Sequence, residues 1–216
     1  RSEEAIREAN RKLNLLNSIT RHDIRNQLMV AHGYTQLAAL NKPDPVITDF
    51  LVKITAAIET IQRQIEFTKA YQELGVHAPA WFLVDEVIRS GRPGKIALHN
   101  TCNAVEIYAD PMIDNVFFNL FDNAEKYGER VTAVTVRCEE RENGLVITFA
   151  DNGSGIPANE KQKIFEKGYG QNTGFGLFLV QEILAITGIT INETGTYGKG
   201  AVFEITVPEG AYRKAT

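Results

Sequence analysis

The chain has 216 residues, of which 44% are hydrophobic and 23% charged, an ordinary balance for a globular protein of one or two domains. No apolar run reaches the roughly 18 residues needed to cross a bilayer, and the charged N-terminus is unlike a signal peptide. The first residue is not Met, so we expect a cytoplasmic fragment of a longer protein without direct membrane contact. The net charge of −4 argues against nucleic acid as a partner, since that partner requires a basic face.

Residues 1–75 are predicted to form a helical hairpin, with one helix near 3–40 and a second near 46–73. The segment NKPDP between them is a strong turn signal. In the first helix, apolar residues recur at gaps of three and four: Ile6, Ala9, Leu13, Leu16 and Ile19. In the second helix, gaps of four and three alternate without a break: Ile47, Leu51, Ile54, Ile58, Ile61, Ile65 and Thr68.

This long, narrow apolar seam predicts a homodimer. Two helices cannot hide both of their seams from water, whereas two hairpins can do so as a four-helix bundle. The alternative is that the hairpin packs on the C-terminal domain of its own chain.

His22 is the one histidine that the hairpin pattern singles out. Polar residues interrupt the apolar seam around it, so its ring is predicted to face solvent. A neutral imidazole is a good nucleophile, and the adjacent Asp23 can orient it or take its proton. The alternative is a solvated surface residue, and His32, on a different face, is interpreted as structural or surface.

Residues 76–216 are predicted to form a second domain of mixed α and β structure, after a linker at 75–79. The predicted fold is an α+β sandwich, a mixed sheet with helices on one face. The expected strands are 105–110, 131–140, 145–151, 189–194 and 201–208, and the expected helices are 110–127, 159–165 and 174–187. Cys102 and Cys138 are expected to be reduced thiols, because two distant cysteines make neither a disulfide framework nor a zinc site.

Two clusters in this domain suggest a ligand site. Asn119, Asn123 and Lys126 share one helix face, where an amide oxygen can ligate Mg²⁺ and an ammonium can neutralise phosphate; alternatively, the asparagines bond a neighbouring loop. Asp151 ends a strand, where a carboxylate can accept a hydrogen bond from an exocyclic amine. Gly153 and Gly155 follow, and the alternative there is a plain turn.

Gly174 and Gly176 open the helix near 174–187. Free N–H groups and the positive end of a helix dipole favour phosphate at such a terminus. The segment is neither a Walker A loop, since no GK[ST] follows, nor a Rossmann fingerprint. On its own it is weak evidence.

Taken together and in order, NLFDNAEKY, DNGSGIP and GFGLFLV resemble the N, G1 and G2 boxes of the histidine-kinase ATP-binding domain, a relative of gyrase, Hsp90 and MutL. KIFEKGY (163–169) resembles the F box, and HDIRN (22–26) resembles the H box in its HDxxN form. The resemblance covers essentially the whole chain. It implies a hairpin for dimerisation and histidine phosphotransfer at 1–75 and an ATP-binding domain at 76–216.

The resemblance also implies a role for each matching residue. Asn123 would hold Mg²⁺, and Asn119 and Lys126 would meet the phosphates of ATP. Around the base, Asp151 would read the adenine amino group and Tyr127 would flank the ring. The glycines that would line the base pocket or close over the phosphates are Gly153, Gly155, Gly174 and Gly176. The lid would lie between Phe165 and Gly174.

The implied activity is a histidine kinase with ATP and Mg²⁺ as cofactors. His22 would be the phosphoacceptor, Asp23 its acid/base partner, and Asn26 a residue that places water to dephosphorylate the partner. That partner would be the receiver domain of a response regulator. The sequence departs from the common form of the H box at two points: it has the shorter Asp23 in place of the usual glutamate, and it lacks the proline that usually follows. Two alternatives remain: a serine-directed regulator kinase of the same superfamily, and an inactive dimeric signalling module.

Overall fold

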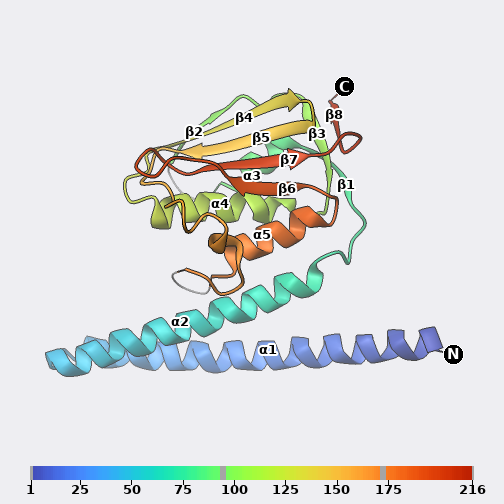
Figure 1. Ribbon diagram of the computed structural model, residues 1–216. Helices are drawn as coiled ribbons and strands as arrows, with labels where there is room; N and C mark the ends of the chain where they lie inside the picture. The colour runs from blue at the N-terminus through green and yellow to red at the C-terminus, as the bar shows by residue number, and fades with distance from the viewer. Residues whose placement is uncertain (1, 93–95, 171–173, 216) are drawn as a thin grey trace. The chain divides into compact units, whose positions relative to one another are not determined.

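The computed structural model describes residues 2–92, 96–170 and 174–215, with side chains described from residue 20 onward (Figure 1). The chain divides into two compact units, residues 1–70 and 71–216. Within the described residues, no helix combines the length and apolar character needed to cross a membrane.

The first unit is the predicted antiparallel pair of helices, α1 (Ser2–Leu40) and α2 (Pro45–Glu73). Asp44 caps α2, because its Oδ1 accepts hydrogen bonds from the backbone N–H groups of Val46 (2.9 Å) and Ile47 (3.0 Å). Both predicted helix ranges are confirmed to within a residue. The predicted seam over residues 6–19 lies outside the described side chains.

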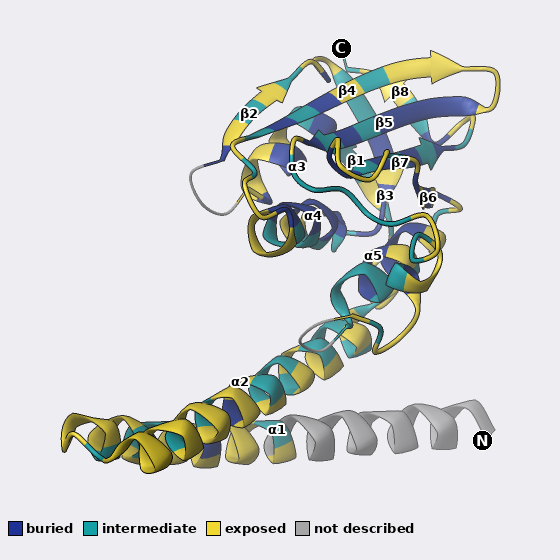
Figure 2. Ribbon diagram, turned by 60° about the vertical axis from the view of Figure 1, so that its left-hand side comes forward, coloured by how far each residue is buried: buried dark blue, intermediate teal, exposed yellow. Residues whose placement is uncertain are grey.

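The seam of α2 consists of two rows with different exposure. Ile58 is 5% exposed, and Leu51 and Ile65, seven residues to either side, are half-buried. The alternate row is open to solvent at 41–47% of each side chain: Ile47, Ile54 and Ile61. One hairpin therefore covers only one of its two apolar rows, and much of its surface is exposed (Figure 2).

The second unit is built on a five-stranded sheet in the order β2-β4-β5-β7-β6, together with a three-stranded sheet in the order β1-β3-β8. The strands of the larger sheet are β2 (Ala97–Asn100), β4 (Ala133–Arg141), β5 (Gly144–Asp151), β6 (Thr190–Glu193) and β7 (Val202–Val207). Those of the smaller sheet are β1 (Ala80–Leu83), β3 (Val105–Ala109) and β8 (Tyr212–Lys214). The helices are α3 (Val84–Ser90), α4 (Ile113–Tyr127), the 3₁₀ turn η1 (Lys163–Phe165) and α5 (Gly176–Ala185).

The larger sheet is mixed, because β2 runs parallel to β4 whereas the other pairs are antiparallel. Helices α4 and α5 cover one face of it (Figure 1). The ring of Phe121 on α4 meets Phe149 on β5 edge-to-face at 5.0 Å, and both are fully buried. The predicted α+β fold with a mixed sheet is confirmed, and this packing fixes α4 against the strand that ends in Asp151.

Several elements differ from the sequence prediction. Strands β1, β2 and β8 and helix α3 were not predicted, and β3 belongs to the small sheet rather than to the main one. Helix α4 begins at Ile113, three residues later than predicted, because the chain first makes a turn. In this turn, Oδ1 of Asp110 accepts a hydrogen bond from the Met112 N–H (2.8 Å). The helix expected at 159–165 is only the short turn η1.

The prediction of two reduced thiols is wrong, since Cys102 and Cys138 form a disulfide. The unpredicted parallel pairing of β2 with β4 is the reason. It places Asn100 opposite Val136, so the two cysteines, each two residues further along, lie side by side. Their separation of 36 positions in the chain hides this proximity.

Candidate functional site

The site begins where the C-terminal end of α4 meets the loop after β5. Gly153 lies so close to Gly128 that a Cβ atom there would be 2.5 Å from the Gly128 carbonyl oxygen. The Ser154 N–H donates to the same oxygen (3.3 Å). Asn152 extends the junction, accepting from the N–H groups of Thr132 (3.0 Å) and Ala133 (3.2 Å). The predicted N-box and G1 segments are therefore adjacent, and Gly153 is required for that approach.

Asp151 lies at the centre of this junction and is 9% exposed. Its Oδ1 accepts hydrogen bonds from the backbone N–H groups of Gly153 (2.8 Å) and Ala201 (3.1 Å). Burial raises the pKa of the Asp151 carboxyl, the two N–H donors lower it, and the charge of Glu193 raises it further. Because both of these bonds use Oδ1, Oδ2 is the oxygen left to accept a hydrogen from a ligand.

The start of α5 lies against the middle of α4. A Cβ atom on Gly176 would be 2.8 Å from Oδ1 of Asn119, whose Nδ2 donates to the Asn115 carbonyl (2.7 Å). The G2 glycine and the first N-box asparagine are thus neighbours. Gly155 and Gly174 both have positive φ, and the Gly174 carbonyl accepts from the Gly168 N–H (3.1 Å) at the base of the predicted lid. Residues 171–173 of that lid lie outside the described residues.

The remaining N-box side chains occupy the last turns of α4. Asn123 is half-buried, and its amide makes no hydrogen bond to any described residue. Lys126 pairs with Asp122 at 2.7 Å on the surface, an exposed pair that a stronger anion can displace. Tyr127 is partly exposed at the helix end. The chain thus offers an amide and an ammonium one turn apart, next to the Asp151 loop.

This donor set fits Mg²⁺ bound chiefly through the phosphates of a ligand. Among the described residues, no group of three or more His, Cys, Asp or Glu side chains could hold a metal ion. Mg²⁺ retains several waters and needs few protein ligands when phosphates are present. The oxygen of the Asn123 amide, which is not used within the described chain, is suited to that role.

His22 lies on α1 with its side chain 73% exposed. Its Nδ1 is 3.3 Å from Oδ1 of Asp23 and 3.4 Å from Nδ2 of Asn26, one helical turn away. These long contacts are loose, and both involve the same ring nitrogen. Nδ1 is thus the nitrogen oriented by its neighbours, and Nε2 is the one left for chemistry. His32 is bonded instead to Gln36 through its Nε2 (3.2 Å).

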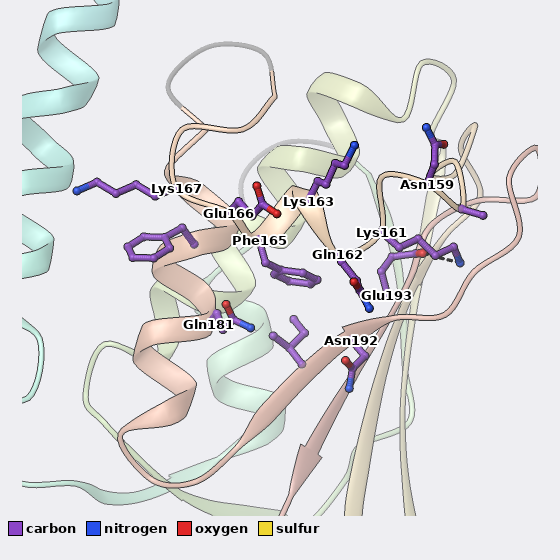
Figure 3. A pocket seen from close by; sticks show the side chains of 13 residues that line it. Asn159, Lys161, Gln162, Lys163, Phe165, Glu166, Lys167, Gln181, Asn192 and Glu193 are labelled. Atoms are coloured by element: carbon purple, nitrogen blue, oxygen red, sulfur yellow. Dashed lines mark ion pairs between the residues drawn. The ribbon is translucent and has the colours of Figure 1, made fainter.

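A hollow of about 1020 Å³ lies elsewhere on the second unit, among η1, α5 and β6 (Figure 3). The residues predicted to contact the nucleotide or Mg²⁺ do not line it, although Glu166 and Lys167 of the predicted lid do. Lys161 and Glu193 pair in its wall, with 2.7 Å between Nζ and Oε2. Sequence reasoning missed this pair, because two ordinary charged residues 32 positions apart form no motif.

Comparison with known proteins agrees with this geometry. Residues 109–211 match the family described as histidine kinase-, DNA gyrase B-, and HSP90-like ATPase. The matched part of the chain contains the N, G1 and G2 segments and is similar to the ATPase domains of that family.

The relatives that it resembles include proteins described as sensor proteins. The sensor protein SrrB of Staphylococcus aureus (strain NCTC 8325 / PS 47) is 31% identical over 106 residues, which are 45% of this chain and 18% of SrrB. The chain thus spans less than a fifth of the length of that relative.

Solved structures share the fold. The structure of full-length ShkA in complex with AMPPNP matches with a TM-score of 0.64 at 20% identity, over 93% of this chain and 46% of that one. The histidine kinase AdeS of Acinetobacter baumannii matches with a TM-score of 0.54 at 19% identity, over 86% of this chain and 96% of that one.

Proposed function

We propose that this chain is the catalytic core of a histidine kinase, which transfers the γ-phosphoryl group of ATP to His22. The observation that carries the proposal is the convergence of distant segments on one site. The Asp151 loop packs on the end of α4 through Gly153, and the start of α5 packs on the same helix at Asn119. The family match over residues 109–211 and the exposed His22 on a separate helical hairpin support it.

In this proposal the nucleotide lies along α4. Asp151 accepts a hydrogen from the 6-amino group of adenine through Oδ2, while Tyr127 flanks the base. Asn119 and Lys126 contact the phosphates, and the N–H groups near Gly174 and Gly176 close over them. Asn123 would hold Mg²⁺, which would supply charge neutralisation on the phosphates.

The transfer depends mainly on the positioning of His22 and the γ-phosphoryl group relative to each other. Nε2 of His22 attacks the γ-phosphorus, a P–N bond forms, and the bond from that phosphorus to the β–γ bridging oxygen breaks. ADP leaves with the electron pair. Asp23 holds Nδ1 on the opposite side of the ring and stabilises the positive charge that develops there, consistent with its 3.3 Å contact.

The phosphohistidine then serves an aspartate on the receiver domain of a response regulator. Asn26, whose amide reaches the same ring, would place a water that dephosphorylates that regulator. The working unit is a homodimer, because the open row of Ile47, Ile54 and Ile61 needs a second hairpin to cover it.

The test is labelling with Mg·ATP carrying ³²P in the γ position. Wild-type protein is expected to retain the label, and His22→Gln is expected to lose it. His32→Gln is the matched control, since it changes the other α1 histidine ten residues away. Equal labelling of wild type and His22→Gln would overturn the proposal, and so would an unlabelled wild type.

A further inference from the structure

Asp151 is held in place by a backbone group fifty residues away in the chain. Of the two N–H groups on its Oδ1, that of Gly153 belongs to its own loop, whereas that of Ala201 comes from the connection between β6 and β7. The direction in which Oδ2 points therefore depends on how that connection, residues 194–201, is held.

Glu193 organises this connection from inside the fold. Its Oε1 accepts hydrogen bonds from the N–H groups of Gly195 (3.0 Å) and Val202 (3.1 Å), at the two ends of the connection. Val202 directly follows Ala201, so Glu193 fixes the peptide next to the one that donates to Asp151. The Thr194 N–H also donates to the Val202 carbonyl (2.8 Å), which closes the base of the connection.

Lys161 makes this arrangement possible. The Glu193 side chain is 0% exposed, and a buried carboxylate without a cation is strongly unfavourable. Lys161 Nζ lies 2.7 Å from Oε2 and also donates to the Gly195 carbonyl, while its side chain remains 23% exposed (Figure 3). Because Lys161 belongs to the segment that follows the G1 glycines, the pair ties that segment to the end of β6.

We propose that Lys161 and Glu193 are positioning residues for base recognition: they hold the 194–201 connection so that the Ala201 N–H fixes Oδ1 of Asp151 and leaves Oδ2 aimed at the amino group of the base. This inference rests on the proposed function, in which Asp151 reads adenine. It adds that purine selectivity is set partly by a buried ion pair outside the nucleotide pocket.

The test compares the dissociation constants of Mg·ATP and of the Mg complex of purine riboside 5′-triphosphate for the 216-residue protein. The analogue keeps the ring and the phosphates but lacks the 6-amino group. Wild type is expected to prefer ATP by about tenfold or more, the range for a hydrogen bond to a charged group. A wild-type ratio near one would overturn the role of Asp151 itself, and the positioning role with it.

The variants separate positioning from folding. Glu193→Ala and Lys161→Met are expected to reduce the preference for ATP to about threefold or less, because Asp151 loses its orientation. In contrast, the double variant Lys161→Met/Glu193→Gln is expected to keep most of the preference, since the amide oxygen still accepts both N–H groups and the amide NH₂ no longer faces an ammonium. Lys199→Met is the matched control, an exposed lysine of the same connection without an ion pair to any described residue.

Two results would contradict the positioning role of Lys161 and Glu193. If Glu193→Ala and Lys161→Met bind both nucleotides more weakly by the same factor, the pair is merely structural and the proposal fails. It also fails if the double variant Lys161→Met/Glu193→Gln loses the preference for ATP as completely as Glu193→Ala. Should Glu193→Ala not fold, judged by circular dichroism, the comparison of Lys161→Met with the double variant decides the question alone.

Discussion

Replacing Asp151 with asparagine removes the interaction on which base recognition depends. The side-chain oxygen of asparagine can still accept the N–H groups of Gly153 and Ala201, but an NH₂ group then takes the place of Oδ2. That group donates hydrogens and faces the amino group of adenine, which also donates. A lost hydrogen bond to a charged acceptor is worth about 1.5–3 kcal/mol. Since 1.4 kcal/mol is tenfold, Kd for Mg·ATP should rise by roughly 10- to 150-fold.

Isothermal titration calorimetry measures this change, and the unfolding free energy provides the control. Burial raises the pKa of Asp151, so its charged form is disfavoured in the folded protein. Its contribution to stability is greatest below the unfolded-state pKa and is lost as pH rises through the folded-state pKa. At neutral pH the uncharged Asp151→Asn protein should therefore unfold no more easily than wild type. A Kd within about twofold of wild type would show that Asp151 Oδ2 does not accept a hydrogen bond from ATP.

Four further outcomes are expected. Because the pKa of Asp151 is raised, acidification should weaken Mg·ATP binding to wild type already at a pH above the ordinary aspartate pKa. Titrations of Asp151→Asn over the same pH range should lack this loss of affinity. Gly153→Ala should weaken Mg·ATP binding and destabilise the fold by about 1–3 kcal/mol, because its Cβ would overlap Gly128, whereas Gly33→Ala, with open space around it, should do neither. Ile54→Lys should convert dimer to monomer in sedimentation experiments, and the exposed but off-row Val52→Lys should not. Reduction of Cys102–Cys138 should lower the unfolding free energy by about 4 kcal/mol, as closure of a 36-residue loop implies, and an unchanged denaturation midpoint would contradict this.

The features that could be predicted from sequence are those with local signatures. The two long helices follow from periodic apolar residues and from the turn at Pro43 and Pro45, and their ends were found to within a residue. The α4 and α5 helices and the β4–β5 hairpin were also anticipated, although their boundaries shifted by up to three residues. Each of these patterns is contained in a continuous stretch of chain.

The features that could not be predicted depend on pairing across long separations. Strand β8 has only three residues, and it gains its identity by pairing with β3, more than 100 positions earlier. The disulfide follows from the parallel β2–β4 register, which no local pattern encodes. In the site, the spacing of Asn119 and Asn123 predicts a shared face, but the contact between Asn119 and Gly176 exists only after folding. The hydrogen bonds by which Glu193 holds the 194–201 connection likewise exist only in the folded chain.

The proposed function depends above all on transfer of the γ-phosphoryl group of ATP to His22. Mass spectrometry of peptides from the Mg·ATP-treated protein, handled at alkaline pH to preserve a P–N bond, locates the phosphate directly. One added phosphate is expected on the peptide that contains His22, and brief acid treatment should remove it. Phosphate on a serine or threonine, on His32, or on no residue of a protein that binds Mg·ATP would contradict it.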